Sequence, residues 1–277
     1  MTQLDHRQLA EALLPAVLSA GAIQMRYYRD GVAIDHKDDS SPVTAADRDS
    51  EVVLVEALER AAHGMPVVAE EAMSAGAAPD VSAGGDFFLV DPLDGTREFI
   101  NKRDEFTINI GLISGRRPVF GIVYAPALSD LYITLGAGEA VQAKVDPGSA
   151  ATRLDDLALE PIRARQARHG ALVALASRSH RSAETDEFLA RYAVDSFIQA
   201  GSSLKFCVVA RGDADLYPRL GPTCEWDTAA GHAVLSAAGG SVTMLDGAPL
   251  QYGKSEDRWL NPFFVAWGQG GPLAATA

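Results

Sequence analysis

Apolar positions in the first quarter of the chain recur at helical spacing in two stretches. Residues 6–28 and residues 44–63 each repeat apolar side chains with the period of one helix face. Gly31 and Gly64 follow the two stretches, and glycine commonly ends a helix. The pattern predicts two amphipathic helices. Residues 35–42, which are polar and rich in turn formers, are expected to form a mobile loop between them.

Shorter apolar runs follow the second predicted helix. Residues 67–71 and 87–90 are typical of buried strands, and the first of these runs ends in two glutamates. Alternating apolar and polar positions, separated by turn residues, then predict an antiparallel meander. Its expected strands are residues 106–113, 119–124, 131–135 and 140–145.

Strands and helices alternate from about residue 171 onward. The expected strands are residues 171–176, 196–200, 241–245 and 263–267, and the expected helices are residues 182–192, 203–211 and 228–238. We therefore expect an α+β part in residues 1–160 and an α/β part in residues 161–277, which together form one continuous catalytic unit.

Composition narrows the classes of partner. The chain of 277 residues carries 24 Lys and Arg against 37 Asp and Glu, a net charge of −13 at pH 7. This acidity argues against nonspecific binding to nucleic acid or to anionic membranes. Cys207 and Cys224 do not make a disulfide framework. The sequence starts without a signal-peptide pattern and contains no apolar run of membrane-spanning length. We therefore expect a cytoplasmic protein without a transmembrane segment.

Candidate chemistry is densest in residues 91–96, Asp-Pro-Leu-Asp-Gly-Thr, directly after a buried apolar run. Pro92 lacks a backbone donor, so we expect the strand to end there, and Gly95 permits a tight turn. Asp91 and Asp94 then offer two hard carboxylate ligands, which suit Mg²⁺. The free amides of a helix start suit a phosphate. The alternative is an ordinary turn, because Asp-Gly is common in turns.

Five acids begin or end predicted elements instead of lying on a solvated helix face. They are Asp47, Glu70, Asp91, Asp94 and Asp227. If the strand ends adjoin, these acids converge, and repulsion would raise their pKa values. Divalent cations remove that conflict, and two Mg²⁺ ions roughly 3.5–4 Å apart can clamp the attacking and leaving oxygens of a phosphate. The alternative is that each acid is a helix cap or a surface charge, and for Asp227 alone an N-cap is favoured.

Four short motifs occur in a fixed order along the chain. They are Val-Thr-Ala-Ala-Asp at 43–47, Ala-Glu-Glu at 69–71, Asp-Pro-Leu-Asp-Gly-Thr at 91–96 and Trp-Asp-Thr-Ala-Ala-Gly at 226–231. Together they resemble the lithium-sensitive, Mg²⁺-dependent phosphatase superfamily of inositol monophosphatase. The resemblance covers residues 9–267 and implies the layered αβαβα sandwich of the sugar phosphatases.

Three further stretches resemble one branch of that superfamily. They are Arg-Glu-Phe at 97–99, Gly-Ser-Ser-Leu-Lys-Phe-Cys at 201–207 and Leu-Tyr-Pro-Arg-Leu-Gly-Pro-Thr at 216–223. They are similar to the bacterial 3′(2′),5′-bisphosphate nucleotidases of sulfate assimilation, which remove the 3′-phosphate of adenosine 3′,5′-bisphosphate (PAP).

The resemblance implies a role for each matching residue. The ligands of two or three Mg²⁺ ions would be Glu70, Asp91, the backbone carbonyl of Leu93, Asp94 and Asp227. Asp91 would bridge two ions, and Glu70 is also counted as catalytic. Thr96 and Asp47 would form a hydrogen-bonded pair that orients the attacking water and helps to deprotonate it. The amides of Gly95 and Thr96 would hold phosphate oxygens.

Candidate substrate contacts follow predicted strands of the second part. Ser179 and His180 come after a strand, where α/β sheets place ligand loops; in the resembling family they contact the nucleotide. A capping serine and an exposed histidine are the alternative. Ser202 and Lys205 lie one helical turn apart and could face one ligand, although Lys205 could instead snorkel. Arg219 could grip a second phosphate with two hydrogen bonds.

The implied function is Mg²⁺-dependent hydrolysis of PAP to AMP and phosphate, with its sulfated parent PAPS, which would give APS, as a further candidate substrate. The partner would be this small nucleotide and not nucleic acid, and the enzyme a monomer or homodimer. The family resemblance leaves peripheral association with the inner membrane open. The rivals are an inositol monophosphatase or broad-specificity sugar phosphatase on the same fold, and a non-enzymatic metal-binding module. Lys205 and Arg219 favour the nucleotide, and the full set of expected metal and water-activating residues argues against the binding module.

Overall fold

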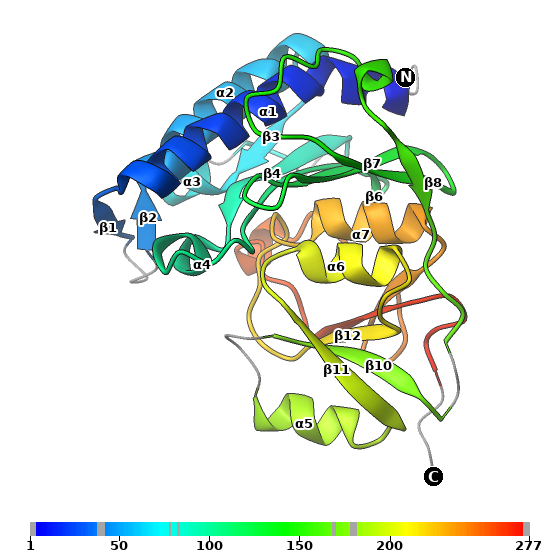
Figure 1. Cartoon of the computed structure of the whole chain (residues 1–277). Coiled ribbons are helices and arrows are strands. Elements are labelled where there is room, and N and C mark those ends of the chain that lie inside the picture. The colour runs from blue at the N-terminus through cyan, green and yellow to red at the C-terminus, as the bar shows by residue number, and fades with distance from the viewer. Residues whose placement is uncertain are drawn as a thin grey trace.

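The computed structural model describes residues 4–37, 42–77, 79–81, 84–167, 170–177 and 182–273. Within these residues the chain is arranged in layers (Figure 1). A helix pair, a seven-stranded sheet, a second helix pair, a five-stranded sheet and an outer helix follow one another. This is the αβαβα sandwich that the sequence predicts, so the predicted fold class is confirmed.

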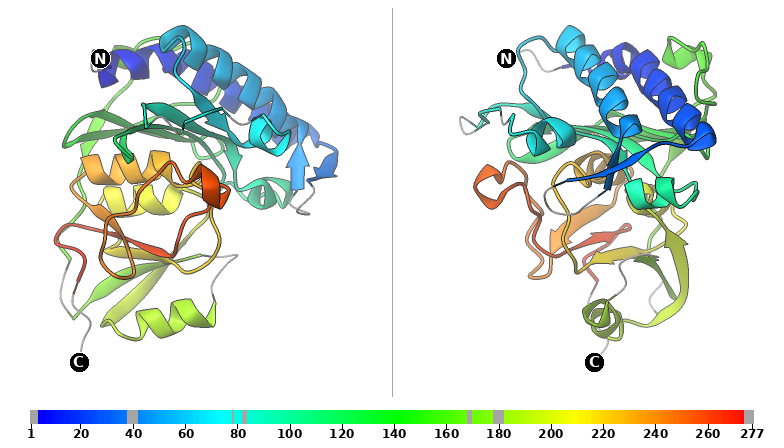
Figure 2. Two further views of the ribbon diagram at one scale, coloured as in Figure 1. Left: turned by 180° about the vertical axis from the view of Figure 1, so that it is seen from behind. Right: turned by 90° about the vertical axis from the view of Figure 1, so that its left-hand side faces the viewer.

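The outer helix pair consists of α1 (His6–Asp30) and α2 (Ala45–Ala61), the two helices predicted from apolar spacing. Both views of Figure 2 show these two helices on one face of the seven-stranded sheet. Their apolar side chains are buried against strands of that sheet. A capping box starts α2: the Thr44 side chain caps the helix, and the Asp47 side chain accepts from the Thr44 amide. The cap therefore fixes Asp47 as well as the helix start.

The seven-stranded sheet contains the predicted meander. In spatial order its strands are β3 (Val67–Ala69), β4 (Phe87–Asp94), β5 (Thr107–Ser114), β6 (Arg117–Ala125), β7 (Asp130–Gly136), β8 (Glu139–Lys144) and β9 (Glu160–Ile162). All neighbours from β4 to β9 pair antiparallel, and β3 pairs parallel with β4. The meander prediction is confirmed.

Strand β4 does not end at Pro92, so that prediction was wrong. The strand continues to Asp94, and its register with β5 shifts between Asp91, opposite Asn109, and Asp94, opposite Thr107. Proline is tolerated in a sheet at such an irregularity, because the ladder is already interrupted there.

Two other predictions need correction. Glu70 and Glu71 do not end a strand; β3 stops at Ala69 and the glutamates begin the short helix α3 (Glu70–Ser74). Part of the predicted loop forms an antiparallel ribbon of β1 (Ile34–His36) and β2 (Pro42–Thr44). These strands are short, and β1 is exposed throughout, so they carry no alternating pattern that sequence analysis could detect.

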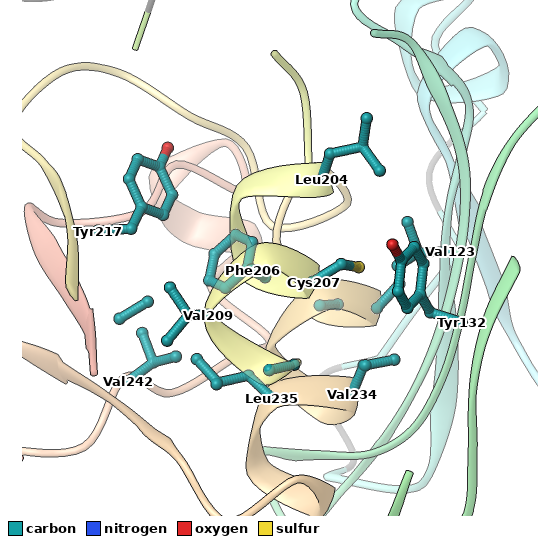
Figure 3. Close-up of a cluster of buried hydrophobic side chains, with 14 of the residues drawn as sticks. Val123, Tyr132, Leu204, Phe206, Cys207, Val209, Tyr217, Val234, Leu235 and Val242 are labelled. Atoms are coloured by element: carbon teal, nitrogen blue, oxygen red, sulfur yellow. The ribbon is translucent and has the colours of Figure 1, made fainter. Parts of the chain in front are cut away.

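Helices α6 (Leu204–Ala210) and α7 (Ala229–Ala237) lie between the two sheets. Figure 3 shows Cys207 and Val234 pointing toward Val123 and Tyr132 of the seven-stranded sheet, while Phe206 points toward Tyr217 on the other side. Because both faces of this helix layer are buried, eight of the nine residues of α7 are buried, and most of them are apolar.

The five-stranded sheet completes the sandwich. Its spatial order is β11 (Val194–Ala200), β10 (Leu172–Ser177), β12 (Leu216–Arg219), β14 (Phe264–Trp267) and β13 (Ser241–Met244). The helix α5 (Ala183–Leu189) covers its outer face (Figure 1). The sequence analysis predicted neither β12 nor β9. The domain boundary placed at residue 160 stays a prediction.

Membrane crossing can be assessed for the described helices. Across that part of the chain, no helix combines the length and the apolarity needed to traverse a bilayer.

Close packing of α7 on β6 depends on Gly121. A Cβ atom there would lie 2.3 Å from the carbonyl oxygen of Ala230, a backbone atom that cannot rotate away. We expect Gly121→Ala to lower the free energy of unfolding by about 1–3 kcal/mol through this overpacking. Gly85→Ala is the matched control, because a Cβ there meets nothing within 4 Å. Urea denaturation measures both variants, and equal effects would contradict the packing argument.

Candidate active site

A cleft of about 260 Å³ opens where the ends of β4 and β12 meet the starts of α6 and α7. Predicted site residues in its wall are Glu70, Asp94, Gly95, Thr96, Ser202, Lys205, Arg219 and Asp227. The fold thus gathers side chains from both sheets and from the helix layer between them.

The irregular end of β4 positions Asp91 at the base of this cluster. Asp91 is 1% exposed, and its Oδ1 accepts from the Leu93 amide at 2.9 Å. From α1, Gln24 Nε2 donates to the Pro92 carbonyl at 2.6 Å. These two bonds satisfy polar groups that the interrupted ladder leaves open, so the outer helix layer helps to hold the acidic strand end.

Burial and mutual repulsion raise the pKa values of the clustered carboxyl groups. Burial, followed by the charges of Glu70, Asp94 and Asp227, raises the pKa of Asp91 well above its usual range. The pKa of Asp227 is raised by burial and then by Asp94 and Glu70. Burial raises the pKa of Glu70 to about 7, although Lys37 opposes the shift. These acids, which belong to separate predicted elements, therefore lie within one electrostatic cluster.

Each of the other three acids also has a hydrogen-bond donor from the protein. Glu70 Oε1 accepts from Lys37 Nζ at 2.6 Å, and Asp94 Oδ2 accepts from Ser202 Oγ at 2.6 Å. These hydrogen bonds direct the carboxylates toward groups of the protein itself. In the described part of the chain, no three His, Cys, Asp or Glu residues lie close enough together to hold a metal ion as they stand. The donor set is nevertheless all oxygen, and a cation would relieve the repulsion that raises the pKa values. The residues present therefore fit a hard divalent ion.

The structure decides between the two interpretations of Asp227. The N-cap residue of α7 is Thr228, and Asp227 Oδ2 instead accepts from the Cys224 amide at 2.8 Å. The N-cap interpretation of Asp227 is therefore wrong. The carboxylate turns back toward the cleft, where Asp94 and Glu70 raise its pKa.

Glu225, to which the sequence analysis assigned no role, supports the segment that carries Asp227. It is fully buried, and its carboxylate accepts from the amides of Gly253 at 2.8 Å and Lys254 at 3.0 Å. Lys254 Nζ adds an ion pair at 2.5 Å. A buried charge with this many donors ties the chain around residues 253–254 to the acidic segment.

Asp47 and Thr96 form the predicted contact. Thr96 Oγ1 lies 3.2 Å from Asp47 Oδ1 and 3.3 Å from the Leu93 carbonyl oxygen. The other carboxylate oxygen of Asp47 accepts from both the hydroxyl and the amide of Thr44, at 2.6 and 2.9 Å. Burial raises the pKa of Asp47, against the effect of those bonds. Asp47 is thus fixed on one side and directed toward Thr96 on the other.

Gly95 makes the turn between the acidic strand and α4 (Thr96–Ile100). Its φ of 96° lies in the left-handed region that favours glycine. A Cβ there would also come within 3.3 Å of the Glu105 carbonyl oxygen. The turn brings the backbone of Gly95 and Thr96 into the cleft wall.

Lys205 and Arg219 place positive charge in the same cleft. Lys205 is 5% exposed, so it does not snorkel; its Nζ donates to the Ser202 carbonyl at 2.5 Å and lies 5.4 Å from the centre of the Tyr217 ring. Burial lowers its pKa to about 8, and Asp94 opposes that shift. Arg219 Nη2 donates to the Pro222 carbonyl at 2.7 Å, while its buried Nε has no hydrogen-bond partner.

The remaining substrate predictions have different outcomes. The Ser202 hydroxyl, with Ser202 at φ 52°, is engaged by Asp94, so it orients a predicted metal ligand. Ser179 and His180 lie outside the described residues. The cleft wall also contains Arg97, Glu98 and Thr223, which the sequence analysis did not single out as contacts. Arg97 and Glu98 directly follow the motif at residues 91–96, and that position could have identified them as part of the site.

Comparison with known proteins gives one consistent result. The Inositol monophosphatase family model matches residues 5–264. The 3′(2′),5′-bisphosphate nucleotidase CysQ of Escherichia coli K12 is 41% identical over 248 residues, 89% of this chain and 94% of that protein. The CysQ protein of Salmonella typhimurium is 41% identical over 259 residues, 93% of this chain and 96% of that protein.

Solved structures agree with these sequence matches. The crystal structure of CysQ from Bacteroides thetaiotaomicron, described as a bacterial member of the inositol monophosphatase family, has a TM-score of 0.79 and 35% identity, covering 96% of this chain and 98% of that one. An IMPase of Thermotoga maritima shares the fold at a TM-score of 0.71 and 21% identity, covering 92% of this chain and 89% of that one. The chain belongs to the inositol monophosphatase family.

Proposed function

We propose that the protein is a Mg²⁺-dependent 3′(2′),5′-bisphosphate nucleotidase that hydrolyses PAP to AMP and phosphate. The observation that carries the proposal is a single cleft in which clustered carboxylates face two cationic side chains, Lys205 and Arg219. The acids alone suit any phosphatase of the family, but the two cations suit a substrate with a second phosphate. The relatives that carry this name cover nearly the whole chain at 41% identity.

The proposed cofactor is Mg²⁺, on which the inositol monophosphatase family generally depends. Its proposed ligands are Glu70, Asp91, the Leu93 carbonyl, Asp94 and Asp227, for two or three ions. When bound, Mg²⁺ supplies positive charge that offsets the carboxylate repulsion and makes an attacking water more acidic. The raised pKa values of these acids support the proposal, because burial and, for Asp91 and Asp227, the neighbouring carboxylates disfavour the charged forms that a cation would stabilise.

Thr96 and Asp47 are the proposed proton acceptors for the attacking water. Thr96 Oγ1 can take a proton from water while it passes its own proton to Asp47 Oδ1, 3.2 Å away. The raised pKa of Asp47 makes its carboxylate a better acceptor, and Thr44 holds that carboxylate in place. Glu70 is the remaining proposed catalytic group, at the side of the cleft nearest Lys37.

The nucleotide would extend from the acids toward Lys205 and Arg219. Arg219 is half-buried in the cleft wall, where its guanidinium is proposed to donate to a phosphate oxygen, and the amides of Gly95 and Thr96 are proposed to hold the scissile phosphate. Ser179 and His180 are proposed further contacts. With two cations beside the acids, a bisphosphate fits this cleft better than inositol monophosphate does.

Asp91→Asn tests the acidic cluster. The folded-state pKa of Glu70, about 7, exceeds its ordinary value of 4.5, so the unfolded chain ionises first as pH rises. The free energy of unfolding in EDTA should therefore fall between about pH 4.5 and pH 7. Asp91→Asn removes the central charge, so it should raise stability in EDTA at pH 7 and abolish most phosphate release with Mg²⁺. Urea denaturation and phosphate release measure the two effects.

Asp215→Asn is the matched control for that substitution. Asp215 is as buried as Asp91, but Arg165 donates to both of its carboxylate oxygens, at 2.8 and 2.7 Å. Its neutralisation should destabilise the fold by about 3–5 kcal/mol, because it leaves a partly buried cation unpaired. A similar loss for Asp91→Asn would show that Asp91 is structural.

Thr96→Ala tests the proton-transfer step. Loss of the hydroxyl should lower kcat by about 10²–10⁴-fold, while the Mg²⁺ concentration for half-maximal activity changes little. Thr96→Ser keeps the hydroxyl and should retain most of kcat. If serine fails as badly as alanine, the hydroxyl is not the group that matters.

Arg219→Ala separates the nucleotide from small phosphate monoesters. Loss of one charge-assisted hydrogen bond, about 1.5–3 kcal/mol, should lower kcat/KM for PAP by roughly 10–150-fold. Inositol monophosphate has no second phosphate, so its kcat/KM should hardly change. Arg219→Lys keeps the charge, so its kcat/KM for PAP should lie between those of the unaltered protein and of Arg219→Ala. Equal losses on both substrates would count against the proposed nucleotide subsite.

A further inference from the structure

Two buried polar side chains of β5 lie beside the acidic end of β4. Thr107 and Asn109 are both 0% exposed, and in the ladder they stand opposite Asp94 and Asp91, respectively. Ile108, between them, belongs to the apolar cluster under the outer helices. Because successive side chains of a strand point to opposite faces, Thr107 and Asn109 face the helix layer between the two sheets. Polar groups buried at such positions are costly unless they are hydrogen-bonded.

Thr107 is the centre of a buried hydrogen-bond network that reaches the start of α6. Its hydroxyl contacts the hydroxyl groups of Ser202 and Ser203, the latter at 2.9 Å. The side-chain oxygen of Asn109 accepts from Ser203 Oγ at 2.6 Å and from Thr107 Oγ1 at 3.2 Å. Ser203 is 1% exposed, so these bonds lie in the protein interior, where they are stronger than in water.

The network ends on the carboxylate of Asp94. Asp94 Oδ2 accepts from Ser202 Oγ at 2.6 Å and from the Ser203 amide at 2.7 Å. Both donors bind the same oxygen, so they orient the carboxylate without using Oδ1. Thr107 therefore stands behind the two residues that orient Asp94.

The segment that carries these two serines has a backbone that needs support. Ser202 has a φ of 52°, a left-handed conformation that is uncommon for residues other than glycine. Gly201 packs so closely on the chain before β5 that a Cβ there would lie 2.8 Å from the Glu105 carbonyl oxygen. Such a backbone persists only where the surrounding contacts hold it. The contact between the hydroxyls of Thr107 and Ser202 is one of them.

We propose that Thr107 is a positioning residue: through the two serine hydroxyls it holds Asp94 in the orientation that binds a divalent ion. This inference rests on the proposed function, in which Asp94 is a metal ligand. Thr107 is fully buried and is not part of the cleft wall, so it acts on Asp94 and not on the substrate. Loss of a group that orients a metal ligand typically lowers metal affinity or activity by about 10–100-fold.

Mn²⁺ binding to the full chain, without substrate, tests the proposal independently of turnover. Mn²⁺ takes the same oxygen ligands as Mg²⁺, and electron paramagnetic resonance measures the free ion. Asp94→Asn should remove one step from the Mn²⁺ titration, which identifies the ion that Asp94 binds. Thr107→Val keeps the shape of the side chain without its hydroxyl, and it should weaken that same step by about 10–100-fold. Thr107→Ser restores the hydroxyl and should retain most of the affinity.

Thr134→Val is the matched control. Thr134 of β7 lies in the same sheet and is 1% exposed, but among the described residues its hydroxyl has no hydrogen-bond partner. The substitution is chemically the same as Thr107→Val and has no link to Asp94. Mn²⁺ binding should therefore be unchanged.

The outcomes separate this inference from the proposed function. If Asp94→Asn binds Mn²⁺ as the unaltered protein does, Asp94 is not a metal ligand and both fail. If Asp94→Asn loses a step while Thr107→Val binds as tightly as the unaltered protein, only the inference is overturned. A purely structural Thr107 would give that second result together with a lower free energy of unfolding in urea.

Ser203→Ala decides the question if Thr107→Val does not fold. It removes the second hydroxyl of the network but keeps the amide that donates to Asp94. The same step of the Mn²⁺ titration should weaken by roughly 2- to 13-fold, the effect of one neutral hydrogen bond. Unchanged Mn²⁺ binding in this variant would also overturn the inference.

Discussion

Repulsion among buried carboxylates is the constraint on which the rest of this structure depends. Asp91 is almost fully buried, and beyond that burial the charges of Glu70, Asp94 and Asp227 raise its pKa, as Asp94 and Glu70 raise that of Asp227. A fold does not bring such groups together through their own attraction. The surrounding structure must hold them there, and positive charge must balance them.

The layered architecture provides that support from several directions. Gln24 of α1 donates a hydrogen bond to the Pro92 carbonyl in the irregular end of β4. The Ser202 hydroxyl, just before α6, donates a hydrogen bond to Asp94. Glu225 fastens the segment that carries Asp227 to the chain around Lys254. The acids are therefore fixed by contacts from the outer helix pair and from the segments that lead into α6 and α7.

Cationic side chains lie in two places near the cluster of acids. Lys37 pairs with Glu70 and Glu71 at 2.6 and 2.7 Å, close to the acids themselves. Lys205 and Arg219 lie in the cleft wall, where a substrate can contact them. The proposed function assigns the acids to the phosphate chemistry, and Lys205 and Arg219 to the remainder of the substrate.

The sequence alone determined the elements with strong periodicity and the identity of the acidic residues. The two outer helices and the meander follow from apolar spacing, because burial imposes that spacing on the chain locally. The position of Asp91 and Asp94 directly after a buried apolar run also distinguished them from ordinary surface acids. It could not show that β4 continues through Pro92, because a contact from Gln24, far away in the chain, stabilises that irregularity.

Only the tertiary structure decided which partner each acid and cation takes. Lys37, Ser202 and Glu225 acquire their roles from residues that are distant in sequence, and no local pattern encodes such a contact. The same holds for Asp227, whose local sequence favours a helix cap but whose carboxylate turns toward the cleft. Local sequence fixes which residue types are present, while their pKa values and directions depend on packing between layers, which assembles only in the complete fold.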